Sequence, residues 1–130
     1  MSQMLAEPYH KNLVISFLNQ SIQNETDVKQ ATEFLEHSLV NSTEPTIIID
    51  LSRVRIMTSA MIGSLLAFKK KCDKERRKLK ICGLTPNIQE VFEMTRLDKV
   101  FKVYPDRDKA LGRNARLNSG GVKRRRSLRE

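Results

Sequence analysis

Three consecutive isoleucines, in the run "TIIIDL" at residues 46–51, limit the fold of this chain more than any other feature. β-branched side chains favour extended backbone. A run that is apolar on both faces predicts a strand covered on both sides, as in a parallel sheet. Parallel strands need crossover connections, which are usually helices. The rest of the chain should therefore alternate between strand-like runs and helical periodicity.

The flanking sequence follows this alternation. Further strands are predicted at residues 13–18, 79–84 and 100–104, with an extra N-terminal strand around 4–9. Helices are predicted over 26–40 with Thr26 as N-cap, from the pair Thr58–Ser59 onward, after Thr85, and in the closing segment "DRDKALGR". We therefore predict a single α/β domain over residues 1–112 with a mainly parallel sheet.

Two hydroxyl residues, Thr58 and Ser59, stand where the pattern changes from strand to helix. Val54 and Ile56 alternate with arginines, so the chain is expected to stay extended up to the pair. From Met61 onward the apolar residues have helical spacing. The pair is thus predicted at the C-terminal edge of the sheet, where sites concentrate in open α/β folds.

These hydroxyls have two interpretations. In the first, the Thr58 oxygen caps the helix by accepting from a first-turn N–H, which stabilises a helix by about 1 kcal/mol. In the second, Ser59 is a phosphorylation site. A phosphate adds roughly −1.5 to −2 charges at pH 7, which a helix N-terminus tolerates. A partner docked there would have to bury an unpaired dianion, so one phosphate would abolish binding and leave the fold intact.

Three neighbouring features also have alternative interpretations. Asp50 ends the isoleucine run, and its carboxylate either bonds the next loop or helps to position a partner. Ile62 and Leu66 lie beside the core stripe of the helix, either at the rim of the core or in a docking surface. The basic residues from Lys69 to Arg77 are interpreted as a solvated helix end that complements the helix dipole, with an acidic partner as the alternative.

Charge is distributed unevenly along the chain. The net charge is +9, and residues 113–130 hold seven basic side chains against one acidic. This tail has few apolar residues, so we predict that it is disordered. Its cluster of Lys123, Arg124, Arg125 and Arg126 is typical of segments that bind phosphate backbones. Binding of nucleic acid or of an acidic surface through the tail is therefore an alternative function, although no aromatic residue is interleaved for base stacking.

Several classes of protein do not fit the sequence. No apolar run approaches the length of about 20 residues that a membrane helix needs, and the N-terminus does not resemble a secretory signal. Cys72 and Cys82 are interpreted as small apolar residues in a reducing compartment, so we expect a cytoplasmic protein. No metal-ligand spacing, catalytic acid pair, nucleophile elbow or phosphate loop is present. We expect neither an enzyme nor a requirement for a metal or cofactor.

The stretches "TIIIDLSRVRIMTSAMIGSLLAF" and "LKICGLTPNIQEVFEMTRLDKVFKVY" resemble STAS domains, which are typified by bacterial anti-sigma factor antagonists. The resemblance covers about residues 13–111. It implies a four- or five-stranded sheet with helices mostly on one side. It also implies binding to an anti-sigma factor that is often a serine kinase. Phosphorylation of the serine that matches Ser59 would break the complex, and a phosphatase would restore it.

The sequence departs from the family pattern at two positions. Thr58 stands where the family commonly has aspartate, and Met61 stands where a glycine is usual, whereas Gly63 is retained. Thr58 is therefore a competing phosphorylation site. The predicted partner-binding set comprises Thr58, Ser59, Ile62, Gly63, Leu66 and Asp50. A STAS scaffold without a phosphorylation switch is a further alternative.

Overall fold

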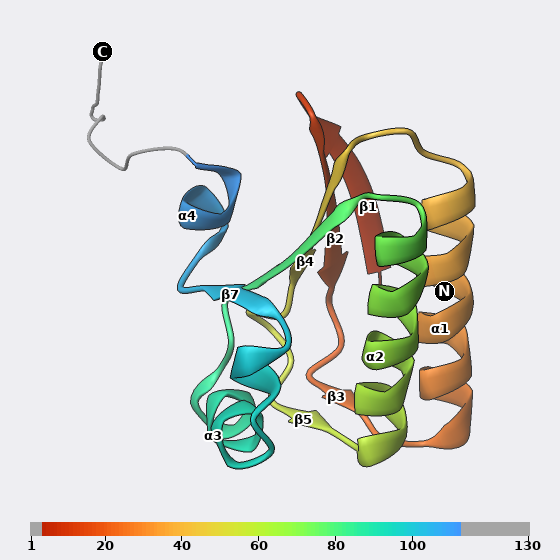
Figure 1. Ribbon diagram of the computed structural model, residues 1–130. Coiled ribbons are helices and arrows are strands. Elements are labelled where there is room, and N and C mark those ends of the chain that lie inside the picture. Colours follow the sequence, from red (N-terminus) through yellow and green to blue (C-terminus); the bar gives the residue numbers. More distant parts are fainter. Residues whose placement is uncertain (1–3, 113–130) are drawn as a thin grey trace.

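The computed structural model describes residues 4–112, which form a five-stranded sheet and a separate two-stranded sheet (Figure 1). The strands are β1 (Met4–Tyr9), β2 (Asn12–Phe17), β3 (Ser21–Ile22), β4 (Thr46–Asp50), β5 (Ile56–Met57), β6 (Lys78–Cys82) and β7 (Lys102–Tyr104). The helices are α1 (Glu25–Val40), α2 (Ser59–Lys74), α3 (Pro86–Met94) and α4 (Arg107–Leu111), with a 3-10 turn η1 (Leu97–Lys99).

The large sheet has the strand order β1-β2-β4-β6-β7. β1 is antiparallel to β2, and the other four strands are parallel. The isoleucine run forms the central strand β4, where Ile47, Ile48 and Ile49 are each 0% exposed. α1 and α2 lie side by side over one face, and the short α4 lies on the other (Figure 1). The predicted mainly parallel sheet with helices mostly on one side is confirmed.

The isoleucine run supplies apolar side chains to both faces of β4. Ile47 and Ile49 belong to the main core, together with buried residues of α1, α2 and α3. Ile48 points the other way and packs with Val14, Cys82 and Ala110 of α4. Because both faces are covered, an alternating polar pattern would have left polar groups unpaired in one of the two cores.

Both cysteines are buried and form no disulfide. Burial raises the pKa of the Cys72 thiol and of the Cys82 thiol from 9.0 to about 12. Each side chain therefore stays protonated and uncharged at neutral pH. This confirms that they act as small apolar residues of the two cores.

The start of α1 differs from the prediction. Asn24 is the N-cap, and its side-chain oxygen accepts a hydrogen bond from the Asp27 N–H at 2.8 Å. The predicted cap at Thr26 is wrong, because the helix begins at Glu25 and Thr26 already lies in its first turn. Asparagine is at least as favourable as threonine in this role.

The segment between β4 and α2 also differs from the prediction of continuous extended backbone. A turn follows β4, in which the Val54 N–H donates to the Leu51 carbonyl oxygen at 3.0 Å. The chain then forms β5, which pairs in parallel with β3. Val54 is fully buried, whereas Ile56 in β5 is 47% exposed. A continuous strand would have placed Val54 and Ile56 on the same face. The turn instead leaves Val54 in the core and Ile56 exposed to solvent.

Arg77 does not belong to a solvated helix end, so that interpretation is wrong for this residue. Its side chain is 8% exposed. The guanidinium donates to the carbonyl oxygens of Leu39, Ser42 and Glu44 at 2.9, 3.3 and 2.8 Å, and to Ser42 Oγ at 2.7 Å. Arg77 therefore ties the end of α1 and the following loop to the start of β6.

Residues 113–130 lie outside the described part of the chain. The predicted boundary after residue 112, the disordered tail and the cluster of Lys123, Arg124, Arg125 and Arg126 thus remain predictions. Within residues 4–112, no helix combines the length and the apolar character needed to cross a bilayer.

Candidate functional site

The two-stranded sheet positions the N-terminal end of α2. Ser21 pairs with Ile56 and Ile22 with Met57, and the Thr58 N–H donates to the Ile22 carbonyl oxygen at 3.2 Å. Because β3 leads into α1 and β5 leads into α2, the two helices begin side by side at the same end of the large sheet (Figure 1). This places the hydroxyl pair at the edge where the parallel strands end.

Thr58 and Ser59 lie in different environments. Thr58 is the N-cap residue of α2, with φ −86° and ψ 167°, yet its side chain makes no capping hydrogen bond. Its Oγ1 is buried without a hydrogen-bond partner. The prediction that this oxygen caps the helix is therefore wrong. Ser59 is the first residue of α2, and its side chain is exposed.

The first turn of α2 has no negative charge of its own. Its first helical hydrogen bond is donated by the Ile62 N–H to the Thr58 carbonyl oxygen at 3.1 Å, which leaves the preceding N–H groups without helical partners. The first turn contains no acidic residue. An anion attached to Ser59 would thus meet unpaired N–H groups and the positive end of the helix dipole.

Four predicted site residues form one stripe on α2, which we call the α2 stripe: Ser59, Ile62, Gly63 and Leu66. Their spacing places them on one side of the helix. Ser59 and Gly63 are exposed. Ile62 and Leu66 are half-buried and pack against the main core, so both lie at its rim, and their role in a docking surface stays a prediction.

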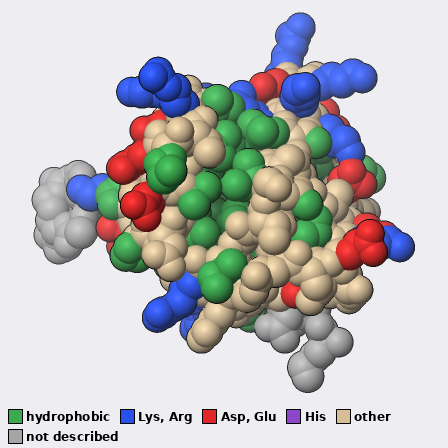
Figure 2. Space-filling model, turned by 90° about the horizontal axis from the view of Figure 1, so that it is seen from below, with side chains coloured by type: hydrophobic (Ala, Val, Ile, Leu, Met, Phe, Trp, Pro, Cys, Tyr) green, Lys and Arg blue, Asp and Glu red, His purple; other side chains and the backbone are tan. Residues whose placement is uncertain are grey.

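Sequence reasoning missed the neighbouring surface of β5. Ile56 is 47% exposed, and Arg55 before it is also exposed. Figure 2 views the molecule from this end and shows hydrophobic side chains gathered in the centre of the face. A two-residue strand is too short for its side-chain periodicity to predict which residues are exposed. The exposure of Ile56 follows only from how β5 pairs with β3 in the folded structure.

Gly63 leaves an open position on the α2 stripe. A Cβ atom added there would meet no atom within 4 Å apart from its chain neighbours and the backbone of its own helix, and the residue does not have a positive φ. A glycine inside a helix costs roughly 0.5–1 kcal/mol relative to alanine. Neither the backbone conformation nor a close contact within the fold therefore requires glycine at this position.

Asp50 is separated from the α2 stripe and has a structural role. Its side chain is buried, with the residue 8% exposed. Oδ1 accepts from the Ser52 N–H at 2.9 Å, which is the predicted bond to the next loop. Oδ2 accepts from Arg107 Nε and Nη2 at 3.1 and 2.9 Å, and Arg107 Nη2 also donates to Ser16 Oγ at 2.8 Å. Asp50 thus holds the turn after β4 and anchors α4, and its alternative role in positioning a partner stays a prediction.

The fold and the site together define a small α/β domain with an exposed helix N-terminus at the end of its sheet. The family model described as the STAS domain matches residues 12–110. The chain therefore belongs to the STAS domain family.

Solved structures of similar proteins agree with this assignment. The chain is 25% identical to an anti-sigma-factor antagonist (STAS) domain protein from Planctomyces limnophilus, over 85% of this chain and 96% of that one, with a TM-score of 0.74. It is 27% identical to an anti-sigma factor antagonist from Mycobacterium paratuberculosis, over 84% and 90% of the chains, with a TM-score of 0.69. The Bacillus cell fate determinant SpoIIAA in its phosphorylated form shares the fold at 16% identity, over 84% and 96%, with a TM-score of 0.63.

Proposed function

We propose that this protein acts as an anti-sigma factor antagonist whose docking surface is the α2 stripe and whose switch is phosphorylation of Ser59. The observation that carries the proposal is the contrast between exposed Ser59 and the buried, unpartnered Oγ1 of Thr58. The proposed partner is an anti-sigma factor or serine kinase, which binds while Ser59 is unphosphorylated. A phosphatase resets the switch.

Similarity to named antagonists supports the choice of partner. The proteins from Planctomyces limnophilus and Mycobacterium paratuberculosis are both described as anti-sigma factor antagonists, and the chain covers most of each. The phosphorylated form of SpoIIAA indicates that the same fold accommodates a phosphorylated state in another protein.

The physical argument concerns where charge is tolerated. On the free protein, a phosphate at Ser59 is solvated and interacts favourably with the α2 dipole, by about 0.3–1 kcal/mol. In a complex, the same group would be buried between the α2 stripe and the partner. An unpaired buried charge costs several kcal/mol, and each 1.4 kcal/mol weakens binding tenfold. The switch therefore acts on docking and needs no change of fold.

Phosphate mapping tests the choice of hydroxyl. The full chain is incubated with ATP and the kinase captured on it from source cells, and the modified residue is located by mass spectrometry. We expect phosphate on Ser59 in the native chain and in Thr58→Val, which removes the buried hydroxyl. We expect none in Ser59→Ala. Phosphate on Thr58, or on neither residue, would rule out the proposed switch.

Gly63→Ala separates the requirements of the fold from those of docking. Because the new methyl group meets no atom beyond its chain neighbours and the backbone of its own helix, we expect the free energy of unfolding to rise by about 0.5–1 kcal/mol. The same methyl group projects from the α2 stripe and should weaken partner binding several-fold. Urea denaturation and a binding titration measure the two effects. A variant that is both more stable and bound as tightly would place the docking surface elsewhere.

A further inference from the structure

A cleft with a strong excess of positive charge lies at the opposite end of α2 from Ser59. It is formed by the last turns of α2, the start of β6 and the start of β7, and its volume is about 270 Å³. Its lining comprises Lys69, Asp73, Arg76, Arg77, Lys78, Leu79, Val100 and Lys102. We call it the basic cleft. We propose that the basic cleft binds a multiply charged phosphate anion.

The charge of the basic cleft does not reflect the average of the domain. Residues 1–112 contain 17 basic and 14 acidic side chains, whereas the cleft lining contains five basic and one acidic. The single carboxylate, Asp73, is already paired with Lys69 at 2.8 Å. Within residues 4–112, the side chains of Arg76, Lys78 and Lys102 make no ion pair or hydrogen bond. Three cations are thus free to meet an external anion.

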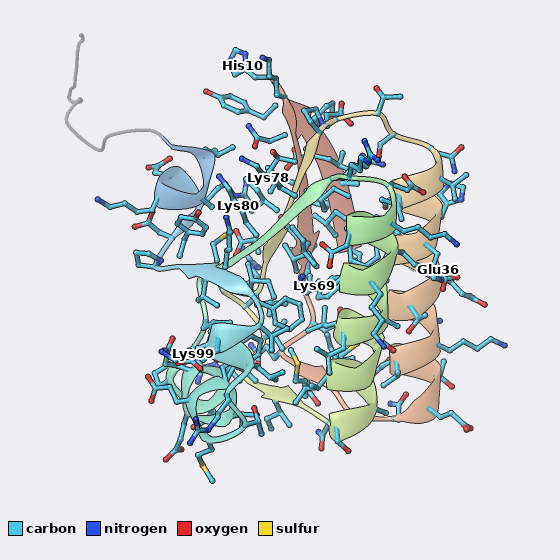
Figure 3. All side chains as sticks on the ribbon, in the orientation of Figure 1. His10, Glu36, Lys69, Lys78, Lys80 and Lys99 are labelled. Atoms are coloured by element: carbon cyan, nitrogen blue, oxygen red, sulfur yellow. The ribbon has the colours of Figure 1, made fainter. Side chains whose placement is uncertain are left out.

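The walls of the cleft strengthen this field. Leu79 is buried and Val100 is 44% exposed, so both add apolar surface beside the cations. A cleft lined by one sign of charge with low-dielectric walls concentrates the potential and raises the local concentration of counter-ions. Figure 3 shows Lys69 on the side of α2 toward β7, and Lys78 on β6.

The neighbouring Lys80 responds to the same excess of charge. Its pKa is lowered, first by burial and then by repulsion from Lys78 and Lys102. Lys80 itself is not available to a ligand, because its Nζ donates to the Ala110 carbonyl oxygen at 2.8 Å and lies over the Tyr104 ring. Lys80 therefore adds to the positive field beside the cleft, whereas Arg76, Lys78 and Lys102 are the cations that a ligand can reach there.

The chemistry of the lining favours phosphate over other anions. Lysine binds phosphate as a point charge, and arginine can bind two oxygens at once. The cleft lining contains no aromatic residue on which a nucleobase could stack. Recognition would thus depend on charge density, which is higher in a pyrophosphate group than in the single carboxylates of an acidic peptide. A multiply charged phosphate of this kind could be a free polyphosphate or the phosphomonoester headgroup of a lipid such as phosphatidic acid.

Calorimetric titration of the full chain with inorganic pyrophosphate tests the proposal. The cleft variant carries Lys78→Gln and Lys102→Gln. A matched control carries Lys70→Gln and Lys74→Gln, which are exposed on α2 outside the cleft. A tail variant replaces Lys123, Arg124, Arg125 and Arg126 with Gln. Circular dichroism confirms that each variant is folded.

We expect saturable binding to the native chain that weakens as salt is raised. The cleft variant should bind at least about tenfold more weakly, while the control and tail variants bind within about twofold of the native chain. Absence of saturable binding, or equal losses in the cleft variant and either other variant, would overturn the proposal.

A second arm distinguishes the two sources of phosphate. The native chain and the cleft variant are sedimented with phosphatidylcholine vesicles, with and without phosphatidic acid, whose phosphomonoester headgroup is multiply charged. Together with pyrophosphate binding, sedimentation that needs both phosphatidic acid and the two lysines identifies a lipid headgroup as a ligand of the site. Pyrophosphate binding without sedimentation supports it with a soluble anion. Absence of pyrophosphate binding contradicts the site whatever the vesicles show, and it leaves the proposed switch at Ser59 untouched.

Discussion

Ser59→Asp is expected to lose the anti-sigma factor partner while keeping its fold. Immobilised native chain should retain the partner from a lysate of source cells, and the variant should retain at least about tenfold less. The reason is that a carboxylate buried without a counter-charge costs several kcal/mol, and 1.4 kcal/mol already gives a factor of ten. On the free protein the carboxylate lies at the positive end of α2, so the melting temperature should change by no more than about 3 °C.

Thr43→Asp is the matched control for this experiment. Thr43 is exposed in the loop after α1, far from the α2 stripe, so the added charge remains in solvent. We expect this variant to retain the partner as the native chain does. If Ser59→Asp and Thr43→Asp retain equal amounts, negative charge at the start of α2 does not control docking. If both lose the partner, the effect is one of net charge and the site is not specific.

Arg77→Lys is expected to lower the free energy of unfolding by about 2–3 kcal/mol. The guanidinium of Arg77 donates to three carbonyl oxygens and one hydroxyl, spread over the end of α1 and the loop that follows it. An ammonium group keeps the charge but concentrates its three donors at one point. Some of these acceptors would therefore lose their partner in a buried place, where each loss costs about 1–3 kcal/mol.

Arg76→Lys is the control, because Arg76 is exposed and makes no hydrogen bond or ion pair through its side chain within the described residues. Its effect should stay within about 0.5 kcal/mol. Urea denaturation measures both variants, and an unchanged m-value shows that the folded and unfolded states are otherwise comparable. Equal losses for the two variants would mean that the bonds of Arg77 contribute nothing beyond its charge.

Much of the candidate site could be predicted because its features are local. The helical spacing that begins at Met61 predicts where α2 starts, and the position of Ser59 follows within one or two residues. Which of two adjacent hydroxyls is accessible could not be predicted in this way. That depends on the pairing of β5 with β3, which joins residues more than 30 positions apart. Ile56 became part of the exposed surface for the same reason.

The amino-acid sequence by itself determined the central strand β4, the alternation of strands with helices and the buried face of α2. Side-chain period and burial are coupled along a single element, so a local pattern is sufficient for these features. Only the tertiary structure decided that Thr58 Oγ1 is buried, that Asn24 begins α1 and that Arg77 bonds the end of α1. Each of these outcomes depends on which polar partners the fold brings within hydrogen-bonding distance, and the spacing of residues along the chain does not determine that.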